Sequence, residues 1–347
     1  MSSVFLRFMQ IKEKNKKNKI TELRQDLVTG DWVVIAAGRA KRPEEFAQKA
    51  QEEIVEDTSH ACFFCYPEET GQEEAVLIYA NEAGDWSLRV FPNKYPAFSR
   101  GKKIKHIEEG PYFGMDGVGY HELVVTRNHE KQIALLSNEA VTEIIDAYQD
   151  RYIDLMNKKS VNYIEIFHNH GKKAGASITH PHSQLMAIPV ISPYIKSELD
   201  GAESYHKANK HCVYCAMIEW ELECKKRIVF ENANFLAFCP YSSRVAFEIW
   251  IVPKKHKPYF ERINSVEKAE VAEALQIAIA KIFKGLNNPD YNFYIHTSPC
   301  DGKDYPHYHW HIEILPRTAE WAGFEISTGI EISTIQPEAA ADFLRNQ

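Results

Sequence analysis

The sequence predicts an α+β protein made by tandem duplication of one unit, with mainly antiparallel sheets and flanking helices. Three observations predict it: two Cys-x-x-Cys pairs, two His-x-His segments, and the same order of apolar segments between them in each half. Strand-like runs surround one long amphipathic stretch per half. That pattern is expected of an antiparallel sheet with a helix inserted before its last strands.

The first half contains each element of this unit once. After the first Cys pair, apolar periodicity predicts a strand, a helix with an apolar stripe, and a second strand that leads through a Gly-rich loop to the first His-x-His. In order, these are a strand over 122–126, a helix with Ser137 or Asn138 as its N-cap, and a strand over 163–167.

The second half repeats this order after the second Cys pair. His180 follows His129 at nearly the separation at which His309 follows His256, which supports duplication. Residues 99–118, rich in Gly, Lys and Glu, are predicted to be an additional loop of the first half. The repeated segments are a strand over 248–252, a helix capped by Ser265, and a strand over 293–295.

Charge and apolar composition indicate which kinds of partner and which cellular compartment to expect. The formal net charge is −7, so no basic field indicates nucleic acid or an anionic membrane. No apolar run approaches the roughly 20 residues that a bilayer-spanning helix needs. Residues 1–21 place an apolar patch before a Lys/Asn run, the reverse of a secretory signal, and are predicted to be a disordered tail. We therefore expect a cytoplasmic protein with reduced thiols and neither nucleic-acid nor membrane partners.

The Cys pairs and the trailing histidines predict two zinc sites per chain. Thiolate and imidazole ligands suit tetrahedral Zn²⁺, and the i, i+3 spacing lets both thiolates of a pair face one ion. A thioredoxin-type redox pair would open a helix after a strand, whereas Cys62 follows a polar run. A zinc-ribbon nucleic-acid module would need four clustered cysteines and a basic surface. The predicted ligand sets are Cys62, Cys65, His129 and His180, and Cys212, Cys215, His256 and His309.

Histidines at alternate positions indicate chemistry beyond metal binding. On a strand, alternate residues share one face, so each half presents a row of imidazoles, or of imidazoles and an amide. Structural zinc explains His180 and His309 but leaves His182, His307 and His311 without a role. The small residues of the loop over 169–177 suit a phosphate-binding nest of backbone N–H groups.

These segments resemble the galactose-1-phosphate uridylyltransferase family of the histidine-triad superfamily, from about residue 22 onward. The resemblance implies two histidine-triad-like halves, 22–192 and 193–347, joined near 190–211. The segments that carry it are Arg24-x-Asp26-x-x-Thr29-Gly30-x-Trp32, Arg39-Ala40-Lys41-Arg42-Pro43, Cys62-x-x-Cys65, Val90-Phe91-x-Asn93, Gly175-x-Ser177 and His180-Pro181-His182-x-Gln184.

The resemblance implies a ping-pong reaction of a homodimer in galactose metabolism, as a UDP-glucose–hexose-1-phosphate uridylyltransferase. His182 would attack the α-phosphorus of the nucleotide sugar and then transfer the nucleotidyl group to a hexose 1-phosphate. The resemblance further implies the following roles: Gln184 and Ser177 on phosphate oxygens; Phe64, Phe91, Asn93 and Asn169 at the nucleoside; and Arg39 and Arg42, from the neighbouring subunit, at the hexose 1-phosphate.

Elementary chemistry is consistent with such a nucleophile. A neutral imidazole can attack phosphorus only if one ring nitrogen is unprotonated. An acceptor at the other nitrogen fixes the tautomer, and a backbone carbonyl on the zinc-clamped strand would serve. Zinc with four protein ligands would then hold the strand in position instead of acting as a Lewis acid.

Three other functions stay open. Lys94 stands where the family's uridylyltransferases often carry Asp, and the segment over 323–330 lacks an obvious hexose-binding Gln. The second Cys pair resembles a subgroup that includes plant ADP-glucose phosphorylase, although the plant form has Ser at the position of Pro181. An ADP-glucose phosphorylase that uses phosphate as acceptor is the first alternative. A histidine-triad hydrolase using His311 and a non-catalytic zinc scaffold are the others.

Overall fold

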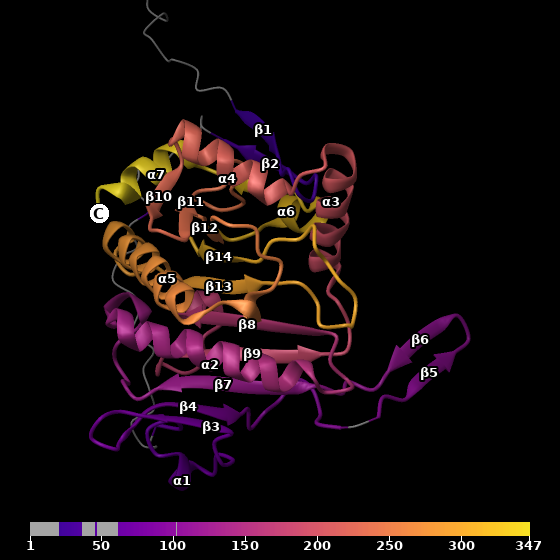
Figure 1. The fold of residues 1–347 in the computed structure, drawn as a ribbon, viewed down its shortest axis with the longest axis vertical. Helices are drawn as coiled ribbons and strands as arrows, with labels where there is room; N and C mark the ends of the chain where they lie inside the picture. The colour runs from indigo at the N-terminus through magenta and orange to yellow at the C-terminus, as the bar shows by residue number, and fades with distance from the viewer. Residues whose placement is uncertain (1–20, 37–45, 47–61, 102) are drawn as a thin grey trace, which may run out of the picture.

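A ten-stranded antiparallel sheet runs through the computed structural model of the protein (Figure 1). The structure describes residues 21–36, 46, 62–101 and 103–347, so residues 1–20 of the predicted tail lie outside it. Within the described ranges the strands are mostly antiparallel and helices flank the sheet, which confirms the predicted α+β class.

The strands follow the same spatial order from each edge of this sheet to its centre. The first half contributes β3-β4-β7-β9-β8, the second contributes β10-β11-β12-β14-β13, and β8 pairs with β13 at the junction. This repetition is what tandem duplication requires. The strands are β3 Leu77–Ala80, β4 Trp86–Pro92, β7 Tyr120–Thr126, β8 Tyr163–His170, β9 His182–Ile188, β10 Ile228–Glu231, β11 Phe235–Phe238, β12 Ile249–Pro253, β13 Tyr291–His296 and β14 His311–Pro316.

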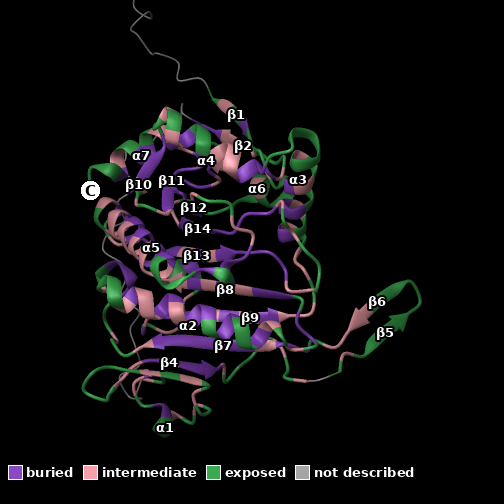
Figure 2. Ribbon diagram, viewed as in Figure 1, coloured by how far each residue is buried: buried purple, intermediate pink, exposed green. Residues whose placement is uncertain are grey.

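Two long helices, α2 (Asn138–Met156) and α5 (Ser265–Leu286), pack side by side on one face of the sheet (Figure 1). Their apolar stripes form the core with the strands beneath them, and Figure 2 shows the buried residues concentrated in this layer. Complete burial of a large apolar side chain contributes about 1.5–3 kcal/mol, so the stripe of α2 is a main source of stability. Its buried apolar members are Val141, Ile144, Ile145, Ala147, Tyr148, Tyr152 and Leu155.

The helix starts are set by side-chain caps. Ser137 caps α2 by accepting the N–H of Ala140, in agreement with one of the two predicted caps. The cap predicted at Ser265 is wrong by one residue, since Asn264 accepts the N–H of Glu267 and the Glu267 carboxylate accepts that of Asn264. This reciprocal capping box satisfies two helix-end donors at once.

The remaining elements lie around this sheet. Within the predicted additional loop, strands β5 and β6 pair as a hairpin that projects from the body (Figure 1). None of the helices in the described ranges combines the length and apolarity needed to cross a membrane. These elements are the hairpin strands β5 His106–Glu109 and β6 Tyr112–Met115; the strands β1 Glu22–Gln25, β2 Trp32–Ile35 and β15 Ile332–Ser333; the helices α1 Pro67–Thr70, α3 Pro193–Asn209, α4 Val213–Cys224, α6 Gly323–Thr328 and α7 Pro337–Arg345; and the 3₁₀ turns Ile133–Leu135, Lys172–Ala174 and Phe260–Arg262.

Residues 22–35 lie against the second half, although the predicted boundary groups them with the first. Strands β1 and β2 form a small sheet with β15, and β2 runs parallel to β15. Arg24, which is buried, pairs with Glu338 of α7, and Ser242 donates a hydrogen bond to Asp26. The first described strands are thus joined to a strand near the C-terminus in this small sheet.

A buried ion pair links α2 to β7 and leads to a stability prediction. Arg151 contacts the Glu122 carboxylate through two hydrogen bonds of 2.7 and 2.8 Å, and both side chains are buried. We expect Arg151→Met to lower the free energy of unfolding by about 3–5 kcal/mol in urea titration, because it leaves a carboxylate buried without its partner. The exposed pair of Arg127 and Asp85 provides the control, since Arg127→Met should cost roughly 1 kcal/mol or less. Equal losses in the two variants would contradict the argument.

Candidate active site and metal centres

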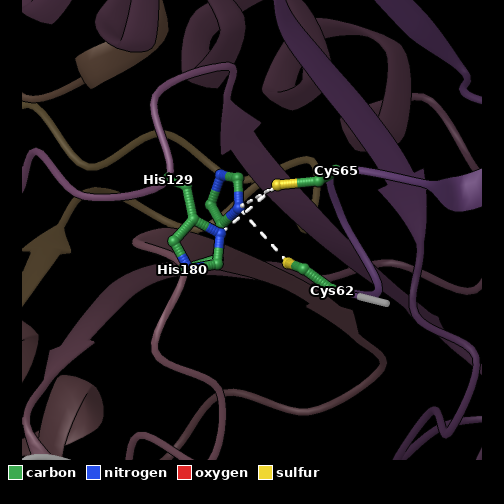
Figure 3. A group of neighbouring side chains, drawn as sticks. All are labelled: Cys62, Cys65, His129 and His180. Atoms are coloured by element: carbon green, nitrogen blue, oxygen red, sulfur yellow. Dashed lines mark hydrogen bonds between the residues drawn. The ribbon is translucent and has the colours of Figure 1, made fainter. Parts of the chain in front are cut away.

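Four side chains of the first half converge as the sequence predicted (Figure 3). Cys62 and Cys65 lie on the turn before α1, His129 follows β7, and His180 lies two residues before the start of β9. The Sγ of Cys65 is 3.3 Å from Nδ1 of His129 and 3.5 Å from Nδ1 of His180, and the Sγ of Cys62 is 3.6 Å from the latter. A tetrahedral zinc ion with ordinary Zn–S and Zn–N bonds separates its ligands by about 3.5 Å, so this donor set fits zinc.

The orientation of His180 also suits a metal ligand. Its Nε2 lies 2.7 Å from the carbonyl oxygen of Thr126, at the end of β7. That nitrogen therefore donates a proton, and Nδ1 directs its lone pair toward the two sulfurs. Hydrogen bonds of this kind fix the tautomer of metal-bound histidines.

The second half brings together its own predicted set, Cys212, Cys215, His256 and His309. The Sγ of Cys215 lies 3.5 Å from Nδ1 of His256 and 3.7 Å from Nδ1 of His309. Both Nε2 atoms donate to backbone carbonyls, at Pro306 and Pro253. The Cys215 thiol, together with the two histidines, lowers the pKa of Cys212, which favours the thiolate form that zinc binds.

His182 opens β9 with its ring in a defined tautomer. Its Nδ1 lies 2.9 Å from the backbone carbonyl oxygen of His180 and therefore carries the proton. The Nε2 lone pair is then available to attack an electrophile. Burial lowers the pKa of His182, so the ring is neutral at neutral pH. The structure thus contains the acceptor arrangement that a nucleophilic imidazole requires, on a strand that begins beside the first Cys₂His₂ group.

Of the side chains predicted to bind the nucleoside, Phe64 contacts His182 directly. Phe64 packs against the His182 ring with a centroid distance of 5.2 Å, and Phe64 and Phe91 are buried in a small apolar cluster with Leu123 and Val125. Asn93 is half-buried at the end of β4 and contacts His121.

The predicted phosphate-binding loop begins at the end of β8, which contains Asn169, and continues toward β9. Asn169 accepts a hydrogen bond of 2.7 Å from Asn292 of β13, and Ser177 is exposed. Gly171 is required by its surroundings, because its φ is +81° and a Cβ atom would lie 2.3 Å from the Asp290 side chain. The loop is therefore held to the second half at its base.

A cavity of about 590 Å³ lies beside this loop and the first Cys₂His₂ group. It is lined by residues that include His129, Asn169 and His180, whereas His182 and Gln184 are not among its lining residues. Its volume is in the range of small-molecule sites. The predicted hexose-phosphate residues Arg39 and Arg42 lie outside the described part of the chain.

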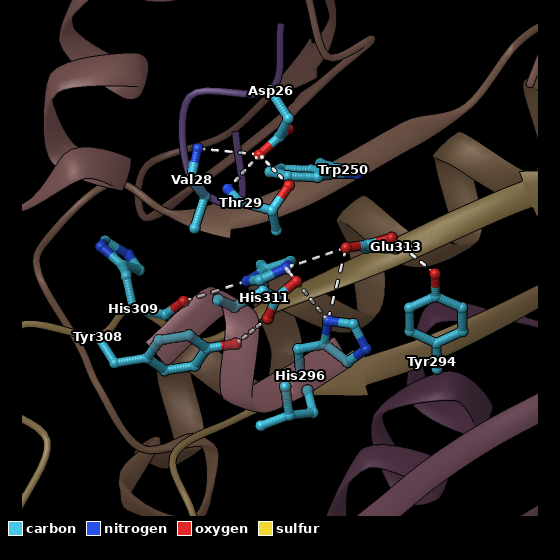
Figure 4. Close-up of polar contacts among 12 residues, drawn as sticks. Asp26, Val28, Thr29, Trp250, Tyr294, His296, Tyr308, His309, His311 and Glu313 are labelled. Atoms are coloured by element: carbon cyan, nitrogen blue, oxygen red, sulfur yellow. Dashed lines mark hydrogen bonds and ion pairs between the residues drawn. The ribbon is translucent and has the colours of Figure 1, made fainter. Parts of the chain in front are cut away.

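A third group of buried polar side chains occupies the corresponding position in the second half (Figure 4). Nδ1 of His311 faces the carbonyl oxygen of His309 at 3.1 Å, just as His182 faces His180. Its Nε2, however, faces the Glu313 carboxylate at 3.3 Å, and Nδ1 of His296 lies 3.1 Å from Glu198. Despite burial, Glu198 and Glu313 raise the pKa of His296 to about 9.

The residue two positions after the second-half histidine His311 is a carboxylate instead of an amide. Although burial opposes it, Arg244 holds the pKa of Glu313 below its usual value, so Glu313 is ionised beside His311. The place beside His311 is therefore filled by a carboxylate paired with Arg244, whereas His182 has the neutral Gln184 in the equivalent place. His307 joins none of the three groups among the described residues.

Sequence patterns did not reveal four of these residues: His121, Glu198, His296 and Glu313. Glu198 and His296 are each isolated in the sequence and reach the group only through packing of α3 and β13. Glu313 had a usable signal, since it stands after His311 in the same register as Gln184 after His182.

The fold and the site define the class of nucleotidyltransferases in the histidine-triad superfamily. The family profile described as "Galactose-1-phosphate uridyl transferase, N-terminal domain" matches residues 10–191, and "Domain of unknown function (DUF4921)" matches residues 118–347. The first match covers more than half of the chain. The protein belongs to the galactose-1-phosphate uridylyltransferase family, as the resemblance of its motifs predicted.

Individual relatives match almost the whole chain. An ADP-glucose phosphorylase of Arabidopsis thaliana is 34% identical over 95% of this chain and 93% of its own length. A galactose-1-phosphate uridylyltransferase of Thermotoga maritima is 29% identical over 93% of this chain and 98% of its own length. The crystal structure of an Arabidopsis thaliana ADP-glucose phosphorylase with bound ADP-glucose superposes with a TM-score of 0.80 at 33% identity, covering 94% of this chain and 99% of that chain.

Proposed function

We propose that the protein transfers the nucleoside monophosphate of a nucleotide sugar through a covalent intermediate on Nε2 of His182. The observation that carries this proposal is the contact of 2.9 Å between Nδ1 of His182 and the His180 carbonyl oxygen, which leaves Nε2 as the unprotonated nitrogen. The relatives and the family profile support the same reaction class.

The reaction balances as two displacements at phosphorus. In the first, the Nε2 lone pair forms a bond to the α-phosphorus, and the bond from that phosphorus to the bridging oxygen breaks, so hexose 1-phosphate leaves with the electron pair. In the second, an oxygen of the acceptor phosphate attacks the same phosphorus and the P–N bond breaks. His182 then returns to its neutral state and its tautomer.

The other predicted residues supply binding and position. Gln184 and Ser177 would donate hydrogen bonds to phosphate oxygens, and Phe64, Phe91, Asn93 and Asn169 would surround the nucleoside. Zinc, when bound at both Cys₂His₂ groups, would use four protein ligands at each and so hold the backbone in position. Because the carbonyl of His180 accepts a hydrogen bond from Nδ1 of His182, a metal on the His180 ring would also fix the nucleophile.

Two donor substrates are supported, and ADP-glucose comes first. The 34% identical relative and the superposed structure are named for ADP-glucose phosphorylase, which favours adenylyl transfer to phosphate. Uridylyl transfer from UDP-glucose to a hexose 1-phosphate, the reaction predicted from the sequence, is supported by the family profile and the 29% identical relative. Lys94 follows Asn93, one of the residues predicted to contact the nucleoside, and its Nζ donates a hydrogen bond to the Thr70 carbonyl.

Trapping the intermediate tests this function. The protein is incubated with ADP-glucose or UDP-glucose that carries ³²P in the α-phosphate, without an acceptor. We expect acid-labile, base-stable label on the protein from one donor, with release of one equivalent of glucose 1-phosphate. Subsequent addition of phosphate or of galactose 1-phosphate identifies the acceptor. Absence of label with both donors, or steady release of free nucleoside monophosphate, would reject the transferase and favour a hydrolase.

The arginines predicted to contact the acceptor give a separate test. We expect Arg39→Ala and Arg42→Ala to retain labelling of the protein but to raise the KM for the acceptor phosphate about 10- to 100-fold. The physical reason is the loss of a charge-assisted hydrogen bond, worth roughly 1.5–3 kcal/mol. Mixing either variant with a His182→Asn variant would restore activity if the arginines act across a homodimer. Variants that fail to form the intermediate would contradict the assignment.

A further inference from the structure

A hydrogen-bond chain of defined direction ends at Gln184. It begins at the backbone N–H of Ala97, which lies 3.3 Å from Nδ1 of His121. A backbone N–H can only donate, so Nδ1 of His121 must be the acceptor nitrogen. The amide nitrogen of Asn93 lies between the two ring nitrogens, 3.4 Å from Nδ1 and 3.1 Å from Nε2, and its oxygen accepts the N–H of Tyr95 at 2.9 Å. The backbone donor of Ala97 therefore sets the direction of the chain.

The direction of the next hydrogen bond follows from this. A neutral imidazole has one N–H, and burial lowers the pKa of His121 and keeps it neutral. With Nδ1 accepting, Nε2 carries the proton. That nitrogen lies 2.8 Å from Oε1 of Gln184, so the amide oxygen accepts and the amide NH₂ is directed away from His121. This assignment does not depend on which amide atom is placed nearer, because the backbone donor at Ala97 determines it.

Strand register places this chain on the same face as the nucleophile. In the pairing of β7 with β9, Leu123 lies opposite Gln184 and Val125 lies opposite His182. Side chains alternate between faces along a strand, so His121 shares a face with both Gln184 and His182. His121 and Gln184 are diagonal neighbours, within reach of long side chains.

We propose that His121 is a positioning residue that fixes the amide of Gln184 with its two N–H donors toward the phosphate attacked by His182. This proposal rests on the proposed function. A free amide can rotate by half a turn and present its oxygen to an anionic phosphate, which replaces an attractive contact by a repulsive one. Held by His121, Gln184 is organised before substrate binds, and its donors meet the charge that develops at phosphorus.

The second half supplies a natural comparison. In the second half, Glu248 occupies the position of His121 and Glu313 the position of Gln184. The register shows this, because Trp250 pairs with Glu313 as Leu123 pairs with Gln184. Both carboxylates contact Arg244, through its backbone N–H or its guanidinium. Neither can donate to a phosphate when ionised. The fold therefore does not require His and Gln at these two positions. This supports a role in the reaction for His121 and Gln184 of the first half.

Three variants at position 121 test the direction of the hydrogen bond. His121→Gln can accept from Ala97 and donate to Gln184, so the single-turnover rate of protein labelling should stay within about threefold of wild type. His121→Leu releases the amide and His121→Glu reverses it, because a carboxylate only accepts. Each should slow labelling roughly 10²-fold, the scale for loss of one transition-state donor. Zinc content and melting temperature of all three should match wild type.

A double-mutant comparison separates positioning from a general structural role. In a Gln184→Ala background, His121→Leu should cause little further loss, because the residue through which it acts is already absent. A full additional loss in that background would overturn the proposal, and so would a His121→Gln variant as slow as His121→Leu. Failure of the wild-type protein to label with either nucleotide sugar would instead reject the proposed function.

Discussion

Replacement of His182 by asparagine should abolish covalent labelling and reduce turnover by roughly 10⁴-fold or more, the scale seen when a nucleophile is removed. Asparagine retains a donor for the His180 carbonyl but has no basic nitrogen, so attack on phosphorus is lost. The measurement is ³²P incorporation, with circular dichroism and zinc content as checks on folding. His182→Gly sharpens the test, because added imidazole can enter the vacated space and should release a free nucleotidyl-imidazole.

His311→Asn is the matched control for this experiment. His311 occupies the equivalent position and makes the equivalent contact with the preceding histidine carbonyl, but Glu313 faces its Nε2. We expect this variant to label at the wild-type rate if it retains its fold. Loss of labelling in His311→Asn with retention in His182→Asn would move the chemistry to the second half and favour the hydrolase.

Loss of either Cys₂His₂ group should remove one zinc ion and a large part of the stability. Zinc binding contributes about 10–16 kcal/mol in small zinc-finger peptides, so we expect Cys65→Ser and Cys212→Ser each to lower the melting temperature sharply. Elemental analysis should fall from two zinc ions per chain to one in each variant. Serine is a good N-cap, so Cys212→Ser does not weaken the start of α4 on that account.

The two zinc variants should differ in activity. Cys65→Ser disturbs the group that contains His180, whose carbonyl orients His182, and should abolish labelling. Cys212→Ser acts in the other half and should retain labelling below its melting temperature. Cys224→Ser, at the end of α4 and outside both groups, should leave zinc content unchanged. A purified, chelator-free protein without zinc would contradict both assignments.

Local periodicity was sufficient to predict the α+β class and most of the main strands and helices. The helix over 138–156 shows an apolar stripe, and the two Cys₂His₂ groups show a spacing that recurs in each half, so both are visible in the sequence alone. The cap of α5 was misplaced by one residue because Asn264 and Ser265 are both good caps, and only Asn264 completes the reciprocal bond with Glu267.

Features that depend on packing between distant segments could not be predicted in this way. His121 meets Gln184 only because β7 and β9 are neighbours in the sheet. Glu198 reaches His296 from α3, a helix that sequence reasoning treated as a linker. Residues 22–35 pack on the second half because β2 pairs with β15, a contact across almost the whole chain. The apolar periodicity within one segment carries no information about which distant segment it will contact.

The junction of β8 with β13 has a consequence for how such a protein can evolve. Five residue pairs, from Tyr291 with His170 to Ile295 with Ile166, join the halves as neighbouring strands of one sheet. Separation of the halves would expose the backbone of two apolar strands, and open edges of this kind invite aggregation. Deletion of the second half would leave the edge of β8 without its partner strand β13. Each half therefore covers a strand edge of the other, so substitutions that change the reactive groups of one half can be retained only while both frameworks persist.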